Sequence, residues 1–441
     1  MQYMSKLYPL ATCAAYVILV VLPSAARPQT PEDFVESGIA KKTIGDFEGA
    51  IADYDRAIEL DPKCVTAYVR RGDVKGMKED WDGAKADYIL AIGLDPENIA
   101  ALVGRGVLKE YNGDFDEAMA DYHRAIELNP KDACAYAHRG TAKKNSGDLA
   151  GAMDDYNRAI ELDPKYAYAY TGRGDIKGLK EDWDGAIEAF NCAIELEPKN
   201  VAPYVGRGNA KCFKKDFEGA MADYDHAIEL GPKYVDAYIG RSNAKGMNGD
   251  LDGALADCSL AIEYRPNYAL AIGTRGHLKI MKGDLDGAIS DYNRAIELDP
   301  KDAYAYNGRS YAKDAKGDFD GAIEDCSRAI ELNSKDAHAY MGRGRAKNSK
   351  KDLDGAIEDY NSAIKLDPKF TYVYDCRGYA KKLKGDFDGA IEDYSRAIEL
   401  DPKDADAYNG RSYAKAEKGD LEGAKSDSKR AVELNSNHHQ L

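Results

Sequence analysis

The sequence has few of the residues from which metal centres and catalytic sites are usually built. It contains seven histidines, of which only His438 and His439 are adjacent, and eight cysteines that form no Cys-x-x-Cys pair. It has no His-Glu-x-x-His motif, phosphate-binding loop, dinucleotide fingerprint or nucleophile elbow. We therefore expect no catalytic residues, no metal and no cofactor.

Basic residues are also fewer than acidic residues. Lysine and arginine total 61 against 77 aspartates and glutamates, which gives a net charge of -16 and a pI near 5.1. A protein that binds nucleic acid would need a basic stripe to offset the phosphate charge. The composition speaks against nucleic acid as a partner and is typical of a soluble acidic surface.

Long apolar runs are confined to the N-terminus. Lys6 is followed by the mostly apolar stretch LYPLATCAAYVILVVL and then by small residues that end at Ala26. The run is short for a membrane-spanning helix, and the small residues fit a signal peptidase site. The pattern predicts a secretory signal peptide over residues 1–26 and a linker over 27–30, hence an exported protein, periplasmic or secreted. An uncleaved membrane anchor is the alternative; after cleavage we expect no membrane contact.

The rest of the chain repeats one unit of 34 residues. An aspartate recurs at this interval from Asp46 to Asp420 without insertion or deletion. A fixed period of this length indicates a solenoid. A tail follows over 439–441, and the twelve predicted repeats span 31–64, 65–98, 99–132, 133–166, 167–200, 201–234, 235–268, 269–302, 303–336, 337–370, 371–404 and 405–438.

Each repeat carries two helical patterns. In the repeat that begins at Thr371, Tyr374 and Gly378 are four residues apart, and Ala390 and Tyr394 repeat this spacing after a break. The small residues allow two helices to approach closely, while the tyrosines supply buried area. One repeat cannot cover that apolar face alone, so its stability must come from stacking on its neighbours.

The helix ends are marked in the sequence as well. Thr30 and Pro31 form a typical helix start at the first repeat. Asp388 is expected to cap the second helix of its repeat and to place negative charge at the helix N-terminus. Asp401 and Pro402 end that helix, because proline disfavours helical geometry in the residue before it.

The spacing of Tyr374, Gly378, Ala390, Tyr394 and Pro402 resembles the tetratricopeptide repeat, and the resemblance covers about nine tenths of the chain. It implies an all-α fold, a right-handed α-solenoid or superhelix of helix-turn-helix repeats. It also implies that the first helices line a concave groove for a protein or peptide ligand. One departure is systematic: the seventh position of the repeat is arginine in eleven repeats, and the eleventh is lysine in all twelve.

The same resemblance implies which residues face the groove. Its contact positions are the second, fifth, sixth, ninth, twelfth and thirteenth of each repeat. In the N-terminal half these positions are partly aliphatic, as at Val69, Val103, Val205 and Ile239, whereas the C-terminal half carries tyrosine and asparagine. Tyrosine with amide neighbours is a good binding composition. The peptide-binding hypothesis therefore names Asn307, Tyr311, Tyr379, Asn409 and Tyr413.

The repeated arginine lies next to the apolar stripe, so it needs a carboxylate partner. Aspartate occupies the twenty-third position in eleven repeats. We expect each arginine to pair with the aspartate of the preceding repeat, because the first repeat has no predecessor and carries Ser37 in place of the arginine. The expected ladder includes the pairs Arg241 with Asp223 and Arg309 with Asp291.

The cysteines suggest no disulfide framework. Seven remain after Cys13 leaves with the predicted signal, an odd number that leaves at least one free thiol or an intermolecular bond in an exported protein. Cys258 and Cys326 stand at the tyrosine position of the second helix and are expected to be buried. A bridge between Cys192 and Cys212 is an open alternative.

These observations predict an exported, non-catalytic scaffold that binds a peptide or helix of another protein in its concave groove. A self-associating structural rod is one alternative, although Lys425 and Ser428 make the last repeat polar where other repeats are apolar. A component of an envelope or polysaccharide assembly machinery is another. The sequence does not determine the partner or the oligomeric state.

Overall fold

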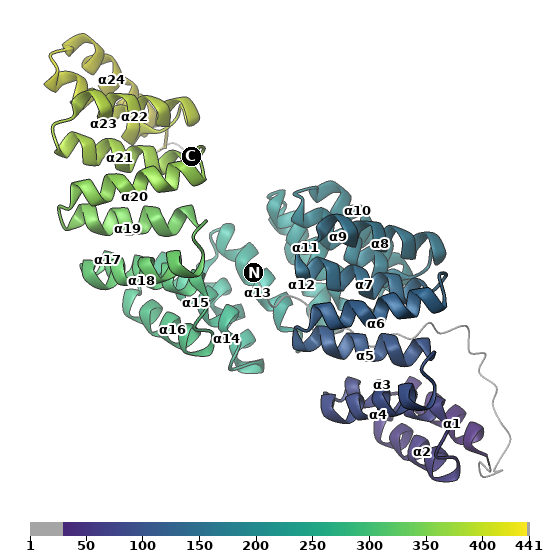
Figure 1. Ribbon diagram of the computed structural model, residues 1–441. Coiled ribbons are helices and arrows are strands. Elements are labelled where there is room, and N and C mark those ends of the chain that lie inside the picture. Colours follow the sequence, from purple (N-terminus) through teal and green to yellow (C-terminus); the bar gives the residue numbers. More distant parts are fainter. Residues whose placement is uncertain (1–29, 439–441) are drawn as a thin grey trace. The chain divides into compact units, whose positions relative to one another are not determined.

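The computed structural model describes residues 30–438. This part of the chain forms twenty-four α-helices and no strand, which confirms the all-α solenoid prediction. Each predicted repeat range contains two helices, and within a unit successive helices lie side by side in chain order (Figure 1). The predicted signal peptide, the linker before Thr30 and the tail over 439–441 lie outside the described residues.

The helices form two compact units, and the division in the sequence falls between Gly240 and Arg241, inside α13 (Val235–Met247). The first unit contains α1 (Pro31–Thr43), α2 (Phe47–Leu60), α3 (Val65–Met77), α4 (Trp81–Leu94), α5 (Ile99–Asn112), α6 (Phe115–Leu128), α7 (Ala133–Ser146), α8 (Leu149–Leu162), α9 (Ala167–Leu179), α10 (Trp183–Leu196), α11 (Val201–Phe213) and α12 (Phe217–Leu230).

The second unit continues the same alternation of first and second helices. It contains α14 (Leu251–Tyr264), α15 (Ala269–Met281), α16 (Leu285–Leu298), α17 (Ala303–Ala315), α18 (Phe319–Leu332), α19 (Ala337–Ser349), α20 (Leu353–Leu366), α21 (Thr371–Leu383), α22 (Phe387–Leu400), α23 (Ala405–Glu417) and α24 (Leu421–His438).

Close packing within and between repeats depends on small residues around one tyrosine. Tyr292 on α16 is fully buried, and Ala288 and Ala295 on either side of it are also fully buried. A Cβ atom added to Gly276 in the same repeat would lie 3.2 Å from the tyrosine ring, and one added to Gly308 in the next repeat would lie 2.3 Å from it. The tyrosine therefore fills the space between two first helices, and glycine leaves room for it.

The helix starts follow the predicted pattern with one correction. Thr30 caps α1 in a reciprocal capping box with Asp33, as its sequence predicts. The second helix of the eleventh repeat, however, begins at Phe387, so its cap is Asp386, whose carboxylate accepts from the Gly389 N–H at 2.9 Å. Asp388 is not the cap because it already lies inside the first turn of the helix.

The arginine ladder has a different register from the predicted one. Arg309 donates to Asp325 of its own repeat, at 2.8 Å from Nε and 2.5 Å from Nη2, and the guanidinium also lies over the Tyr306 ring. Lys313, at the eleventh position, lies 2.9 Å from the same carboxylate. The two helices of one repeat pack against each other, which brings the seventh, eleventh and twenty-third positions together.

The predicted pairing with the preceding repeat is therefore wrong. Asp291, the expected partner of Arg309, accepts instead from Arg275. Likewise Arg241 donates to Asp257, and Asp223 accepts from Arg207. The preceding repeat does form one hydrogen bond with the arginine, but through the residue two positions after its aspartate: Arg309 Nη1 donates to Asn293 Oδ1 at 2.7 Å.

The first and fifth repeats show what the ladder requires. In the first repeat, Ser37 donates to Asp53 at 2.6 Å, so the serine keeps the bond within the repeat that arginine makes elsewhere. In the fifth repeat the aspartate is replaced by Ala189, and Arg173 Nε is buried without a hydrogen-bond partner. Lys177 lies 3.5 Å from Asp182 there, at the helix start.

All seven cysteines within the described residues are free thiols, so the alternative of a Cys192 to Cys212 bridge is not realised. Cys258 and Cys326 are fully buried, as predicted. On the last helix, Lys425 and Ser428 are exposed, which agrees with the polar character expected of that repeat.

Candidate protein-binding groove

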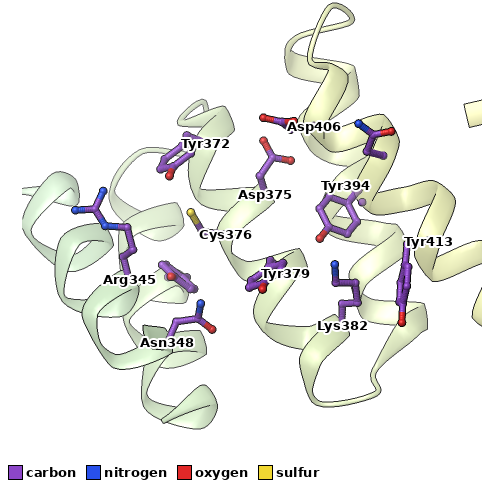
Figure 2. A pocket seen from close by; sticks show the side chains of 13 residues that line it. Arg345, Asn348, Tyr372, Asp375, Cys376, Tyr379, Lys382, Tyr394, Asp406 and Tyr413 are labelled. Atoms are coloured by element: carbon purple, nitrogen blue, oxygen red, sulfur yellow. The ribbon is translucent and has the colours of Figure 1, made fainter. Parts of the chain in front are cut away.

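A pocket of about 520 Å³ opens on the first helices of the last three repeats, within the second unit. Most of its lining residues come from α19, α21 and α23 (Figure 2). The buried tyrosines Tyr360 on α20 and Tyr394 on α22 complete the lining. Nearly all of the wall residues stand at the second, fifth, sixth, ninth or twelfth positions of their repeats. The pocket thus lies where the family resemblance places a ligand.

Three of the five predicted binding residues line this pocket together. Tyr379, Asn409 and Tyr413 are all exposed, and the two tyrosine side chains keep 45% and 52% of their surface open. Tyr311 lies one repeat before the pocket and is 46% exposed. Asn307 is half-buried and does not line the pocket.

A lysine of the protein lies between two of these tyrosines. Lys382 Nζ is 4.6 Å from the centroid of the Tyr379 ring and 4.8 Å from that of Tyr413 (Figure 2). A cation at this distance over an aromatic face is attracted by the ring electrons. Burial lowers the pKa of Lys382. The lysine holds the two rings on either side of it and leaves their outer surfaces to solvent.

A second cation links Tyr311 to the pocket. The Arg345 guanidinium lies 4.4 Å from the centroid of the Tyr311 ring and donates from Nε to Asp314 at 2.7 Å. Arg345 itself lines the pocket. The exposed tyrosines of the ninth, eleventh and twelfth repeats therefore belong to one continuous surface in which tyrosine rings and cations alternate.

Carboxyl groups gather at the opposite side of the pocket. Figure 2 shows the side chains of Asp375 on α21 and Asp406 on α23 turned toward each other. Asp404, the N-cap of α23, also lies near Asp375. Burial, a hydrogen bond with the Asp404 side chain and the charges of these carboxylates raise the pKa of Asp375 to about 8, while its Oδ1 atom is buried without a hydrogen-bond partner.

The pocket has no activated nucleophile among its lining residues. Burial raises the pKa of the Cys376 thiol to about 11, so the thiol is protonated at neutral pH. Burial likewise raises the pKa of the Tyr360 and Tyr394 hydroxyls. No histidine lines the pocket to act as a general base. The arrangement offers stacking faces and charge rather than a nucleophile with its base.

The aliphatic groove positions of the first unit present little surface. Val69, Val103, Val205 and Ile239 are each less than a tenth exposed, because they pack between neighbouring repeats. The sequence pattern identified these residues as groove positions but could not show that stacking buries them. Most of the exposed tyrosines lie in the second unit, and Tyr111 is the exposed tyrosine of the described part of the first.

The sequence reasoning missed several residues of the pocket. It examined the fifth and ninth positions, whereas Tyr372 and Asp406 stand at the second and Asn348 and Lys382 at the twelfth. The signal was available, because the family resemblance names those positions too. The sequence could not show which of their side chains line the same pocket.

Two other features are absent from residues 30–438, a metal-binding cluster and a membrane-spanning helix. No group of three or more histidine, cysteine, aspartate or glutamate side chains there is arranged to hold a metal ion. Within residues 30–438, no helix combines the length and the apolar character that crossing a membrane requires.

Comparison with known families agrees with this geometry. Sequence models described as TPR repeat match residues 43–79, 140–181, 276–313 and 378–419, and models described as tetratricopeptide repeat match residues 99–132, 311–369 and 405–438. Together the matches cover more than half of the chain. The chain belongs to the tetratricopeptide repeat family. Members of this family present solenoid surfaces to other proteins, so a protein-protein interaction scaffold is the coarse function that this membership supports.

Solved structures with tetratricopeptide repeats resemble the chain in fold. A chain of the crystal structure of the APC/C hetero-tetramer Cut9-Hcn1 aligns with a TM-score of 0.53 at 15% identity, over 87% of this protein and 90% of that chain. Yeast Tom70 aligns with a TM-score of 0.47 at 18% identity, over 89% and 96%. At 15% identity the first likeness supports the solenoid fold alone. A search of curated proteins found no match.

Proposed function

We propose that this tetratricopeptide repeat protein is an exported, non-catalytic scaffold that binds a peptide or helix of another protein along the first helices of its last four repeats. The observation that carries the proposal is the pocket between α19, α21 and α23, with the half-exposed rings of Tyr311, Tyr379 and Tyr413 on one surface. Tyrosine offers a large contact area at a small cost in side-chain entropy.

The pocket is held in shape before any partner arrives. The cations of Arg345 and Lys382 lie against the tyrosine rings, and the Arg377 guanidinium is tied to Asp393 by bonds of 2.9 and 2.5 Å behind the pocket. A rigid scaffold loses little conformational entropy on binding, so most of the ordering cost falls on the bound segment. This favours recognition of a flexible or extended segment.

The non-catalytic part of the proposal rests on the chemistry of the pocket. Its one thiol, that of Cys376, is protonated at neutral pH, and no lining residue is a histidine. Export rests on the apolar segment before Ala26 in the sequence. Periplasmic and extracellular locations fit that segment equally well, and an uncleaved anchor is the other possibility.

The proposal can be tested by affinity capture from an extract of the source organism's cell envelope. The bait is the chain from Arg27 onward, in parent form and with Tyr311, Tyr379 and Tyr413 each replaced by Ala. A matched control replaces three exposed apolar residues of second helices in the same unit by Ala: Leu260, Leu366 and Val432. Circular dichroism must show that all three baits keep the same helix content.

We expect a protein captured by the parent and by the control bait but not by the tyrosine variant. Equal capture by all three baits would contradict groove binding, because the contact would then lie on another face. If the bait captures only further copies of itself, the self-associating rod replaces the scaffold.

A further inference from the structure

The protein supplies a cation to carboxylates on the first helices of both units. In the first unit, Lys144 lies 2.7 Å from Asp175. In the second, Arg345 lies 2.7 Å from Asp314 and also stacks on a tyrosine ring. Each pair joins neighbouring repeats and keeps a poorly hydrated carboxylate from being left without a counter-charge.

Asp375 has no such cation. Among the described residues no lysine or arginine forms an ion pair or a hydrogen bond with it, and its Oδ1 atom is buried without a partner. The nearest charged groups from α23 are two further carboxylates, Asp404 and Asp406. Asp314 also has one buried oxygen without a partner, although Arg345 binds its other oxygen; Asp375 differs because it lines the open pocket and has no cation partner in the described part of the chain.

The surroundings fit a donor that is a cation. Tyr372 is 50% exposed at the same pocket, and the nearby Tyr311, Tyr379 and Tyr413 already show cations stacked on their rings. A ring face combined with a carboxylate is the environment that holds Arg345. The Tyr372 ring and the Asp375 carboxyl group offer the same combination, but neither Arg345 nor Lys382, the two cations that line the pocket, pairs with Asp375.

We infer that the bound protein segment carries a lysine or arginine side chain that enters this pocket and pairs with Asp375. The inference deepens the proposed function and rests on it, since it names the chemistry of the segment bound in the same groove. The net charge of -16 favours the approach of a basic segment.

The inference can be tested with a library of random twelve-residue peptides displayed on their encoding RNA. The library is selected separately on the parent chain from Arg27 onward, on Asp375→Asn and on Glu392→Gln. The last variant removes one negative charge from an exposed site on α22 and controls for non-specific attraction of basic peptides. Selection in about 150 mM salt weakens long-range attraction between exposed charges.

We expect peptides selected on the parent and on Glu392→Gln to share a lysine or arginine at one fixed position. That position should lose its basic preference on Asp375→Asn. Changing the basic residue of the best peptide to Gln should weaken binding to the parent about tenfold and to Asp375→Asn less than twofold, because the pair is already broken there. Fluorescence anisotropy with the labelled peptides measures both ratios.

Two results would overturn the inference. Peptides that bind the parent and Asp375→Asn equally, and that need Tyr379 and Tyr413 but no basic residue, would reject the cation while leaving groove binding intact. A selection that enriches no basic position on any bait would also reject it, and the capture experiment above would decide the scaffold function independently. Cooperative thermal unfolding of Asp375→Asn and of Glu392→Gln, at temperatures no lower than that of the parent, shows that neither result comes from misfolding.

Discussion

Arg309 donates two hydrogen bonds to the carboxylate of Asp325, sixteen residues further along the same repeat. Asp325 is only 3% exposed, and its remaining cation is Lys313 at 2.9 Å. The same contact recurs along both units, except in the first repeat, where Ser37 replaces the arginine, and in the fifth, where Ala189 replaces the aspartate. It ties together the two helices of one repeat.

Replacing Arg309 by Leu should lower the free energy of unfolding by about 3 kcal/mol, because it leaves a buried carboxylate with half of its partners. Arg328→Leu is the matched control. Arg328 forms an exposed pair with Glu331, and its loss should have a much smaller effect, because water screens an exposed pair. Urea unfolding followed by circular dichroism compares the two; equal effects would mean that the ladder is no more than a row of solvated charges.

The fifth repeat offers the reverse experiment. Arg173 Nε is buried without a partner there, because Ala189 stands where other repeats carry aspartate. Ala189→Asp should raise the free energy of unfolding by about 1–2 kcal/mol by restoring the pair. Ala189→Asn fills similar space without the charge and should gain less. A loss of stability with Asp would show that this site cannot accommodate the ladder.

Two helical glycines of the second unit should respond in opposite directions to alanine. A Cβ atom at Gly308 would lie 2.3 Å from the ring of Tyr292 in the preceding repeat, whereas one at Gly273 would meet nothing within 4 Å. Gly308→Ala should destabilise by about 1–3 kcal/mol through overpacking. Gly273→Ala should stabilise by up to about 1 kcal/mol, since alanine is the better helix former. Thermal unfolding of both variants checks the contrast.

The raised pKa of Asp375 makes stability depend on pH. Its folded-state pKa of about 8 lies above the unfolded value near 4, so the folded protein binds more protons between these limits. The contribution of this group is therefore fully present below about pH 4 and is lost as pH rises toward 8. The titratable and charged groups that line the pocket with Asp375 are Arg345, Tyr360, Tyr372, Cys376, Tyr379, Lys382, Tyr394, Asp406 and Tyr413, and Asp393 and Asp404 also act on Asp375.

Asp375→Asn should consequently stabilise the protein at pH 8 and have little effect at pH 4.5. We expect a gain of about 1 kcal/mol at the higher pH, because solvent at the open side of the pocket screens part of the effect. Glu392→Gln is the control and should show no such difference between the two pH values. Urea unfolding at both pH values measures it, and an equal effect of Asp375→Asn at the two would contradict the assigned titration.

Much of this fold could be predicted from the sequence. The 34-residue period, the small residues around each buried tyrosine and the proline after most second helices are local signals, and each predicts its element directly. The partner of each arginine in the ladder could not be predicted. Along the chain most of these arginines have one aspartate before them, in the preceding repeat, and one after them, in their own repeat, so the sequence alone does not distinguish the two. Only the packing of the two helices decides that Arg309 pairs with Asp325 and not with Asp291.

The pocket was predictable in position and less so in chemistry. The tyrosines at 379 and 413 could be read from their repeat positions, but Lys382 stands on the next turn of the same helix as Tyr379, and its place between two rings depends on the neighbouring repeat. The unpaired state of Asp375 also depends on which side chains α23 brings toward it. Contacts between repeats, rather than the repeats themselves, carry the specific chemistry.

The measurement that tests the central claim most directly is hydrogen exchange, followed by mass spectrometry, on the chain from Arg27 with and without its captured partner. Binding in the groove predicts slower exchange in α17, α19, α21 and α23, with the largest change around Tyr379 and Tyr413, and little change in α18, α20, α22 and α24. Slower exchange confined to those second helices, or to the first unit alone, would contradict a binding groove in the last four repeats.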